Sequence, residues 1–349
     1  MAVLFGAVWW AWNYSAWAMN WLDPRSGLVR LLNAALMLAA LGMSLALPHA
    51  FDEDGLLFVA CYVGAQVLRA GFMAIAMRGH VLGGNYTNLL AWSATAGVIW
   101  IAGALVPPDL RLAVWLVALV VDVAAPRFNY RFPGLGAAPM STWPTDPEHL
   151  AERNRLVFII ALGESILIMG FTLSELDPVP PGAVLATLLG FAGLFVQWWN
   201  YFALAGHDTQ ASRGYGNTAA LRSAFAYAHA LMVGGAIIVA VSIEVRITHP
   251  ENEPTIVFTS VGGPLVYLLG NILFLRSRTG SVAQSRYGAM AALVLIGVAG
   301  LLLGHSVPSL VVGVATTTVM AALAVITQVS GSRTRAGTDP PASSDGGDV

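Results

Sequence analysis

Eleven long apolar stretches, joined by short polar connections, constrain this chain more than any other feature. A helix needs about 20 mostly apolar residues to cross the hydrocarbon core of a bilayer. Charged residues make up only 10% of the chain, against about 25% in soluble domains. The sequence therefore predicts an all-α, polytopic integral membrane bundle of about eleven transmembrane helices and excludes a soluble enzyme. The stretches are 2–22, 28–49, 56–77, 86–106, 110–126, 156–174, 182–204, 219–247, 255–275, 287–304 and 307–328.

The connections and the C-terminus suggest how the chain is organised. We expect one transmembrane domain over 1–328, with a boundary between two halves in the long connection 127–155. Within that connection, Thr145-Asp146-Pro147-Glu148 matches a capping box with proline in the first turn, so a helix should start at about Asp146. Residues 329–349 are rich in Gly, Ser, Pro and Asp and should form a disordered cytoplasmic tail.

Arginine placement orients the predicted helices. All 17 basic residues are arginine, and the absence of lysine excludes a Schiff base with retinal or pyridoxal phosphate. Only Arg111 and Arg246 lie on the connections of one side, and Arg69 lies inside a span. By the positive-inside rule the C-terminus is cytoplasmic and Met1 is outside. The other side and its tail hold Arg25, Arg30, Arg78, Arg127, Arg131, Arg153, Arg155, Arg213, Arg222, Arg276, Arg278, Arg286, Arg333 and Arg335.

Several aromatic and polar motifs are unusual for a membrane protein. They are Ala7-Val8-Trp9-Trp10-Ala11-Trp12-Asn13-Tyr14, His149-Leu150-Ala151-Glu152-Arg153 with Ile160-Ala161-Leu162-Gly163-Glu164-Ser165, and Trp198-Trp199-Asn200-Tyr201. With them the chain resembles the bacterial low temperature requirement A family to about Gln328. The resemblance implies a multi-pass protein of the bacterial cytoplasmic (inner) membrane whose molecular activity is unsettled. It also implies that the chain lacks the family's first N-terminal span.

A short internal repeat accompanies this resemblance. Trp12-Asn13-Tyr14 in the first span is similar to Trp199-Asn200-Tyr201 in the seventh. If the missing first span is restored, these become spans two and eight of twelve. That spacing predicts two six-helix halves in parallel orientation.

Polar groups inside the spans are the candidate transport residues: Asn13, Arg69, Asp122, Glu164, His229 and Glu244. Each ionisable group costs roughly 2.5–3.5 kcal/mol on insertion and marks function by default. Arg69 and Glu164 have opposite charges at matched depth, so we expect them to pair, either as a structural pair or as a functional one. His229 fits a proton carrier or a hydrogen-bonded packing residue.

Two further patterns concern packing. Trp9, Trp10, Tyr14 and Trp17 of the first span, with Trp198 and Trp199 of the seventh, predict an aromatic seam, although a ligand platform is an alternative. Gly262-Gly263-Pro264 should break the ninth span, because proline cannot donate to the helix ladder.

The chain is therefore expected to act as a secondary transporter or a proton- or ion-coupled permease. The alternative is a non-transporting scaffold or sensor that supports growth at low temperature. No enzyme is expected, because neither G-x-S-x-G nor H-E-x-x-H occurs. The expected partners are membrane lipid and an unidentified substrate or ion, with no nucleic acid, cofactor or metal; the oligomeric state is open.

Overall fold

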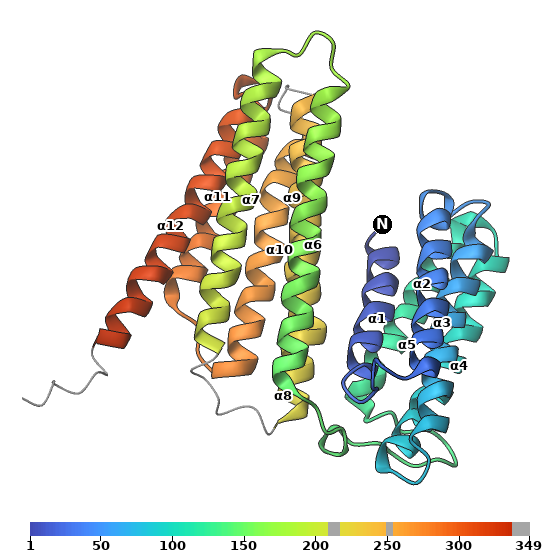
Figure 1. Ribbon diagram of the computed structural model, residues 1–349. Coiled ribbons are helices and arrows are strands. Elements are labelled where there is room, and N and C mark those ends of the chain that lie inside the picture. Colours follow the sequence, from blue (N-terminus) through green and yellow to red (C-terminus); the bar gives the residue numbers. More distant parts are fainter. Residues whose placement is uncertain (209–216, 249–253, 337–349) are drawn as a thin grey trace, which may run out of the picture. The chain divides into compact units, whose positions relative to one another are not determined.

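The computed structural model describes residues 1–208, 217–248 and 254–336, and these are nearly all helical (Figure 1). No strand forms among them, and one isolated β-bridge joins Phe132 and Gly136. The helices are α1 (Ala2–Ala18), α2 (Gly27–Ala46), α3 (Gly55–Ala76), α4 (Val81–Leu105), α5 (Pro108–Ala124), α6 (Pro147–Ser174), α7 (Pro181–Asp208), α8 (Thr218–Arg222), the π-helical segment η5 (Ser223–Ala228), α9 (His229–Thr248), α10 (Pro254–Thr279), α11 (Gln284–Leu303) and α12 (Ser309–Ala336). Short 3-10 turns are η1 (Leu47–His49), η2 (Ala125–Phe128), η3 (Met140–Thr142) and η6 (Gly304–Ser306).

Each predicted apolar stretch coincides with one helical rod, since α8, η5 and α9 form a continuous helix from Thr218 to Thr248. Within the described residues, nine rods are long and apolar enough to cross a membrane, and the other two, α1 and α5, have 17 residues each. The predicted polytopic helical bundle is confirmed. Helix α12 continues to Ala336, and the rest of the predicted disordered tail, 337–349, lies outside the described residues.

The chain divides into two compact units. The first contains Met1–Arg155 and Tyr215–Ala230, and the second contains Leu156–Gly214 and Leu231–Val349. Helix α6 and the α8–η5–α9 rod therefore each begin in the first unit and continue into the second. The single domain over 1–328 stays a prediction, because each unit is described by itself.

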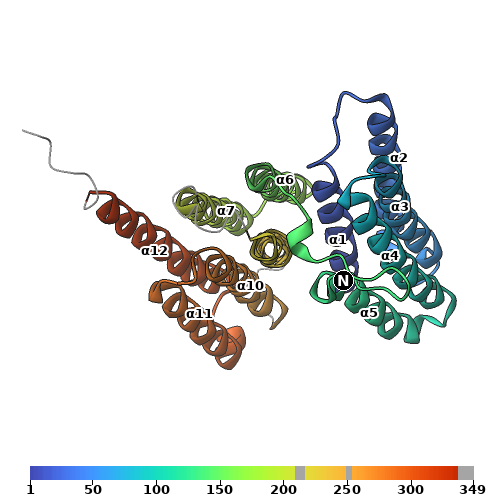
Figure 2. The same ribbon diagram turned by 90° about the horizontal axis from the view of Figure 1, so that it is seen from below.

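In the first unit, α2, α3, α4 and α5 pack in chain order, and α1 lies against α3 and α5 (Figure 2). Phe58, Trp100 and Trp115 are fully buried in this core. The indole of Trp115 donates to the Trp100 carbonyl at 3.0 Å, which ties α5 to α4. Arg111, in the first turn of α5, donates to the Ala104 carbonyl at 3.1 Å and also to carbonyls of the α2–α3 connection. The Arg111 guanidinium thereby joins the end of α4, the start of α5 and the α2–α3 connection.

In the second unit, α10, α11 and α12 pack in chain order, and α7 lies against α12. Phe158 of α6 stacks on Tyr201 of α7 with ring centroids 3.9 Å apart. The order matches that of the first unit, where α3, α4 and α5 pack in sequence and α1 lies against α5. This agreement is what a parallel repeat would produce, and the repeat itself stays a prediction.

The start of α6 differs from the predicted capping box. Asp146, not Thr145, caps the helix: its Oδ1 accepts from the backbone N–H groups of Glu148 at 2.9 Å and His149 at 3.3 Å. Thr145 instead donates its hydroxyl to the Trp143 carbonyl at 3.0 Å. Pro147 explains the shift, because its fixed φ suits the first helical position and leaves Asp146 as the preceding cap.

The predicted break at Gly262-Gly263-Pro264 is wrong, since α10 runs through these residues without interruption. The glycines serve close packing instead. A Cβ on Gly263 would lie 2.9 Å from the Val239 backbone nitrogen, and one on Gly235 would lie 2.7 Å from the Gly263 carbonyl oxygen. Helices α9 and α10 therefore approach at backbone distance, as small residues permit between membrane helices.

This packing makes a direct prediction. Gly263→Ala should destabilise the protein by about 1–3 kcal/mol, because the new methyl group meets backbone that cannot move aside. The neighbouring Gly262→Ala, whose Cβ has no atom within 4 Å, should be neutral or stabilising, because alanine favours the helix. Thermal unfolding in detergent measures both, and equal transition temperatures would contradict the close approach.

Candidate functional site

The first unit contains a buried hydrogen-bonded chain around Arg69. The Arg69 side chain is fully buried on α3 and lies over the Tyr14 ring, 5.3 Å from its centroid. It donates to the Ala11 carbonyl and to the Ser15 hydroxyl, both at 3.2 Å. A further donor nitrogen reaches Gln66, one turn away on the same helix. The guanidinium is thus held entirely by groups of its own unit.

The series of hydrogen bonds continues from Gln66 to a buried carboxylate. Gln66 donates its amide to the Tyr62 hydroxyl at 3.1 Å, and Tyr62 donates to Asp122 at 2.8 Å. The indole of Trp100 donates to the same carboxylate oxygen at 2.9 Å. Arg69 and Asp122 therefore lie at the two ends of one continuous set of hydrogen bonds that joins α1, α3, α4 and α5.

Asp122 is a second candidate for the counter-charge of Arg69, which the sequence analysis assigned to Glu164. Glu164 belongs to the second unit and is exposed on α6, so its pairing with Arg69 stays a prediction. A chain through neutral side chains lets opposite buried charges stabilise each other without contact, because the interior screens them weakly. Sequence spacing could not find this link, since it required knowing that α3 packs against α5.

The predicted aromatic face of α1 docks on the π-helical segment η5. Trp9 donates its indole N–H to the Ala226 carbonyl at 2.7 Å, and Asn13 donates to the Phe225 carbonyl at 3.5 Å. Tyr227 donates to the Val123 carbonyl of α5 at 2.8 Å. The wider π turn offers carbonyls to neighbouring side chains, and π segments are frequent at functional sites.

His229 follows this segment and is buried. Its Nδ1 lies 3.0 Å from the Ala224 carbonyl oxygen, and its ring lies 5.3 Å from that of Phe225. Glu244, by contrast, is exposed on α9. Among the six predicted polar residues, the structure thus brings Asn13 and His229 to one segment and Arg69 and Asp122 to one network.

Arg222 is a buried cation that the sequence analysis placed among the cytoplasmic arginines. Its Cζ lies 4.1 Å from the centroid of the Trp17 ring, and it is within 5.9 Å of the ring centroids of Tyr14, Tyr130 and Trp143. None of its three nitrogens hydrogen-bonds to a described residue. The charge is therefore held by aromatic faces, which attract cations electrostatically. The crowded tryptophans of the first span were the only sequence signal of this cage.

Tyr130, one of the aromatic residues around Arg222, has an unusual backbone conformation. It has φ of 46°, a region that a bulky residue seldom adopts. Its hydroxyl donates to that of Tyr14 at 3.3 Å, and its carbonyl accepts from Asn88 at 3.0 Å. Burial raises the pKa of the Tyr130 phenol, so the group stays protonated and keeps this donor role.

The seam residues of the seventh span lie differently. Trp9, Trp10, Tyr14 and Trp17 are buried, whereas Trp198 and Trp199 are 42% and 41% exposed on α7. The Trp198 ring lies 5.9 Å from that of Phe195 and 5.1 Å from that of Phe202, both on its own helix. The two tryptophans of α7 are therefore partly exposed, whereas the α1 aromatics belong to a buried cluster that also includes Tyr227.

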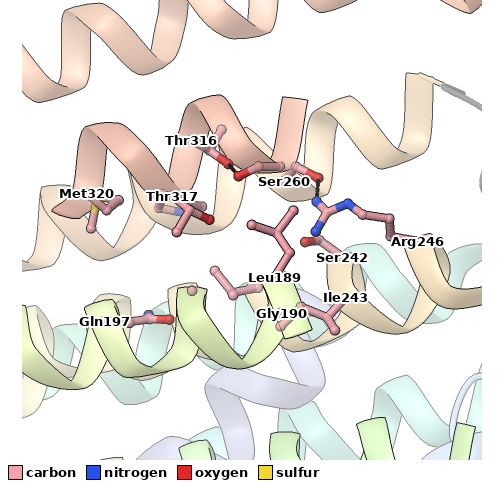
Figure 3. Close-up of a pocket in the computed structure, with 14 residues that line it drawn as sticks. Leu189, Gly190, Gln197, Ser242, Ile243, Arg246, Ser260, Thr316, Thr317 and Met320 are labelled. Carbon is pink, nitrogen blue, oxygen red and sulfur yellow. Dashed lines mark hydrogen bonds between the residues drawn. The ribbon is translucent and has the colours of Figure 1, made fainter. Parts of the chain in front are cut away.

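The second unit contains a cavity of about 40 Å³ between α7, α9, α10 and α12 (Figure 3). A Cβ at Gly313 would lie 2.8 Å from Arg246 Cζ and one at Gly190 would lie 2.5 Å from Ile243, so these glycines permit close packing around the cavity. A Cβ at Gly193 would meet only Thr317, at 3.5 Å, so this glycine borders the space itself. The lining consists of Leu189, Gly190, Gly193, Gln197, Val239, Ser242, Ile243, Arg246, Ser260, Pro264, Gly313, Thr316, Thr317 and Met320.

Two lining side chains are polar, buried and incompletely satisfied. Arg246 is 5% exposed and donates to the Ser260 hydroxyl at 2.6 Å, while its Nε has no partner among the described residues. Gln197 is 4% exposed, and neither atom of its amide hydrogen-bonds to a described residue. Buried polar groups are nearly always hydrogen-bonded, so these two make the cavity a candidate binding site.

Comparison with known proteins identifies the family of the chain. The family model described as "Bacterial low temperature requirement A protein (LtrA)" matches residues 1–325. The chain belongs to this family. A relative from Rhizobium meliloti (strain 1021), described as an uncharacterized protein, is 38% identical over 283 residues, which cover 78% of this chain and 68% of the relative. No solved structure matches the chain.

The family membership confirms the resemblance inferred from the aromatic motifs. It also supports a multi-pass membrane protein, in agreement with the helices of the structure. The matched region contains the Arg69–Asp122 chain, the Arg222 cage and the Arg246 cavity. All three therefore lie inside the LtrA part of the protein.

Double-mutant cycles can identify the partner of Arg69. Arg69→Met and Asp122→Asn should each destabilise the protein, and the double variant should lose less than the sum by about 1 kcal/mol, because each single change leaves one charge uncompensated. Unfolding free energies in detergent give the coupling. A second cycle with Glu164→Gln tests the predicted Arg69–Glu164 pair, and additivity within about 0.5 kcal/mol would reject that pair.

Proposed function

We propose that this protein is a secondary transporter or an ion- or proton-coupled permease of the bacterial cytoplasmic membrane. Its C-terminus faces the cytoplasm in this proposal, because fourteen arginines lie on that side and two on the other. Enzymatic activity is not part of the proposal, since the sequence contains no hydrolase or metalloprotease motif.

The observation that carries the proposal is the cavity inside the second unit. A bundle that only spans the membrane can fill its interior with apolar side chains at high density. Here a space remains beside Gly193 of α7, and Gln197 and Arg246 place polar atoms at it. Gln197 lies roughly four turns into α7, so the space extends well along the helices. Polar groups at such depth are characteristic of substrate and ion pathways.

The buried hydrogen bonds between Arg69 and Asp122 in the first unit support coupling to an ion or a proton. Asp122 is an ionisable group inside the bundle, and Tyr62 connects it by hydrogen bonds toward Gln66 and Arg69. Chains of this kind recur as proton relays in pumps and transporters. The scaffold or sensor alternative requires no such cavity, and it would be favoured by an absence of flux.

Flux through reconstituted protein tests the proposal. Proteoliposomes should transport at least one of protons, alkali cations, small anions or small neutral solutes under an imposed gradient, above the rate of empty vesicles. Gly193→Val should lower this flux at least tenfold, because it fills the cavity where a Cβ would meet only Thr317, at 3.5 Å.

Gly182→Val is the matched control. It makes the same substitution on α7 at a position outside the cavity lining, with no atom within 4 Å of the new Cβ. Its flux should equal that of the wild type. The transport proposal would be contradicted by an absence of flux under every gradient, or by an equal loss of flux in both variants.

Reporter fusions test the orientation. A fluorescent protein joined after Ala336 should fluoresce and alkaline phosphatase joined there should be inactive, because phosphatase folds only outside the cytoplasm. Fusions after Asp177, in the acidic connection between α6 and α7, should give the opposite pair of results. Phosphatase activity at Ala336 would reverse the assigned sides.

A further inference from the structure

The cavity of the second unit has the size of a single small ligand. Its volume is about 40 Å³, whereas one water molecule needs roughly 10–15 Å³ by the same measure. The space therefore suits an ion or molecule of about one to four non-hydrogen atoms. Arg246 and Gln197 lie toward opposite ends of the lining, with the hydroxyl-bearing residues of α10 and α12 between them (Figure 3).

The charge of the lining selects the sign of the ligand. Arg246 is the single charged residue among the lining residues, none of which is acidic. Within the described part of the chain, no carboxylate lies within 4.0 Å of its guanidinium, and Ser260 is its hydrogen-bond acceptor. A buried cation without a counter-charge is costly, so the cavity favours an anion and disfavours a metal cation or a proton.

The remaining donors complete an anion site. Arg246 Nε offers an N–H group that no described residue accepts. The Gln197 amide lies toward the other end of the lining, and neither its N–H group nor its oxygen has a partner among the described residues. Ser242 and Thr317 add hydroxyl groups to the lining. Thr316 differs, since its hydroxyl already donates to carbonyls of its own helix at 3.0–3.1 Å. A guanidinium with several neutral donors binds small anions through charge-assisted hydrogen bonds.

We propose that this cavity binds one small monovalent anion at Arg246, between α7, α9, α10 and α12. The inference rests on the proposed transport function for its biological role, as the transported or coupling ion, but not for binding itself. One guanidinium can balance one negative charge, and the volume excludes large organic anions. The shared chemistry covers halides and small planar oxyanions such as nitrate and formate.

Binding to purified protein in detergent tests the proposal. In gluconate buffer, added chloride, nitrate or formate should raise the unfolding temperature saturably for at least one of the three, whereas sulfate at equal ionic strength should not. Comparison of the three probes distinguishes a halide site from an oxyanion site. Arg246→Gln should weaken the binding at least tenfold, and Arg246→Lys should bind more weakly than wild type while keeping the preference for anions.

Arg276→Gln is the matched control, because it removes one arginine charge from an exposed position of α10 outside the cavity. It should bind as the wild type does. Gly193→Val provides a second route that keeps Arg246 and fills the space, and it should also lose binding. In gluconate alone, Arg246→Gln should be at least as stable as wild type, because it removes an uncompensated buried charge.

Three results would overturn the anion site. They are no saturable stabilisation by any probe, stabilisation that Arg246→Gln retains, and a loss of stability in gluconate on removing Arg246. The last would assign the counter-charge to the protein itself, for example to Glu251 or Glu253, which lie outside the described residues. Anion binding without flux would support the anion site and reject the transport proposal. Flux without anion binding would support the transport proposal and reject the anion site.

Discussion

The stability of this bundle depends on how buried guanidinium groups are compensated. Water is absent from the hydrocarbon region, so a buried charge must be met by hydrogen bonds, counter-charges or polarisable rings. Arg69 meets carbonyl, hydroxyl and amide oxygens and connects to Asp122. Arg111 meets carbonyls at helix ends, and Arg222 meets aromatic faces. Among the described residues, Arg246 donates to the Ser260 hydroxyl and otherwise lines a cavity.

Each form of compensation also fixes which helices pack together. The Arg69 chain needs α1, α3, α4 and α5 in one arrangement, because its oxygens and donors come from all four. The Arg222 cage adds the loop that contains Tyr130 and Trp143, and the η5 carbonyls bind the side chains of α1. Lipid cannot drive such association by the hydrophobic effect, so polar contacts and close packing determine the arrangement.

The sequence predicted the helices well and the contacts less well. Apolar length and arginine placement located all eleven rods, because the bilayer constrains length and composition strongly. Arg69 and Asp122 were singled out by depth, but depth says nothing about which helices are neighbours. Arg222 lies near a span end, where arginines usually face water, so its burial could not be read from its position. The glycine run of α10 signalled packing rather than a break, since neighbouring backbone compensates for Pro264.

The contrast between Arg69 and Arg246 separates the roles of the two units. Both terminal nitrogens of Arg69 have acceptors and the network reaches a carboxylate, although its Nε has no partner among the described residues. Arg246 is also buried, its hydrogen-bond acceptor among the described residues is the Ser260 hydroxyl, and it lines a cavity beside Gly193. A closed network gains little from a ligand, whereas an open one is stabilised by any small group that supplies the missing charge. The Arg69 network thus ties four helices of the first unit together, whereas in the second unit the proposed anion would supply the charge that Arg246 lacks among the described residues.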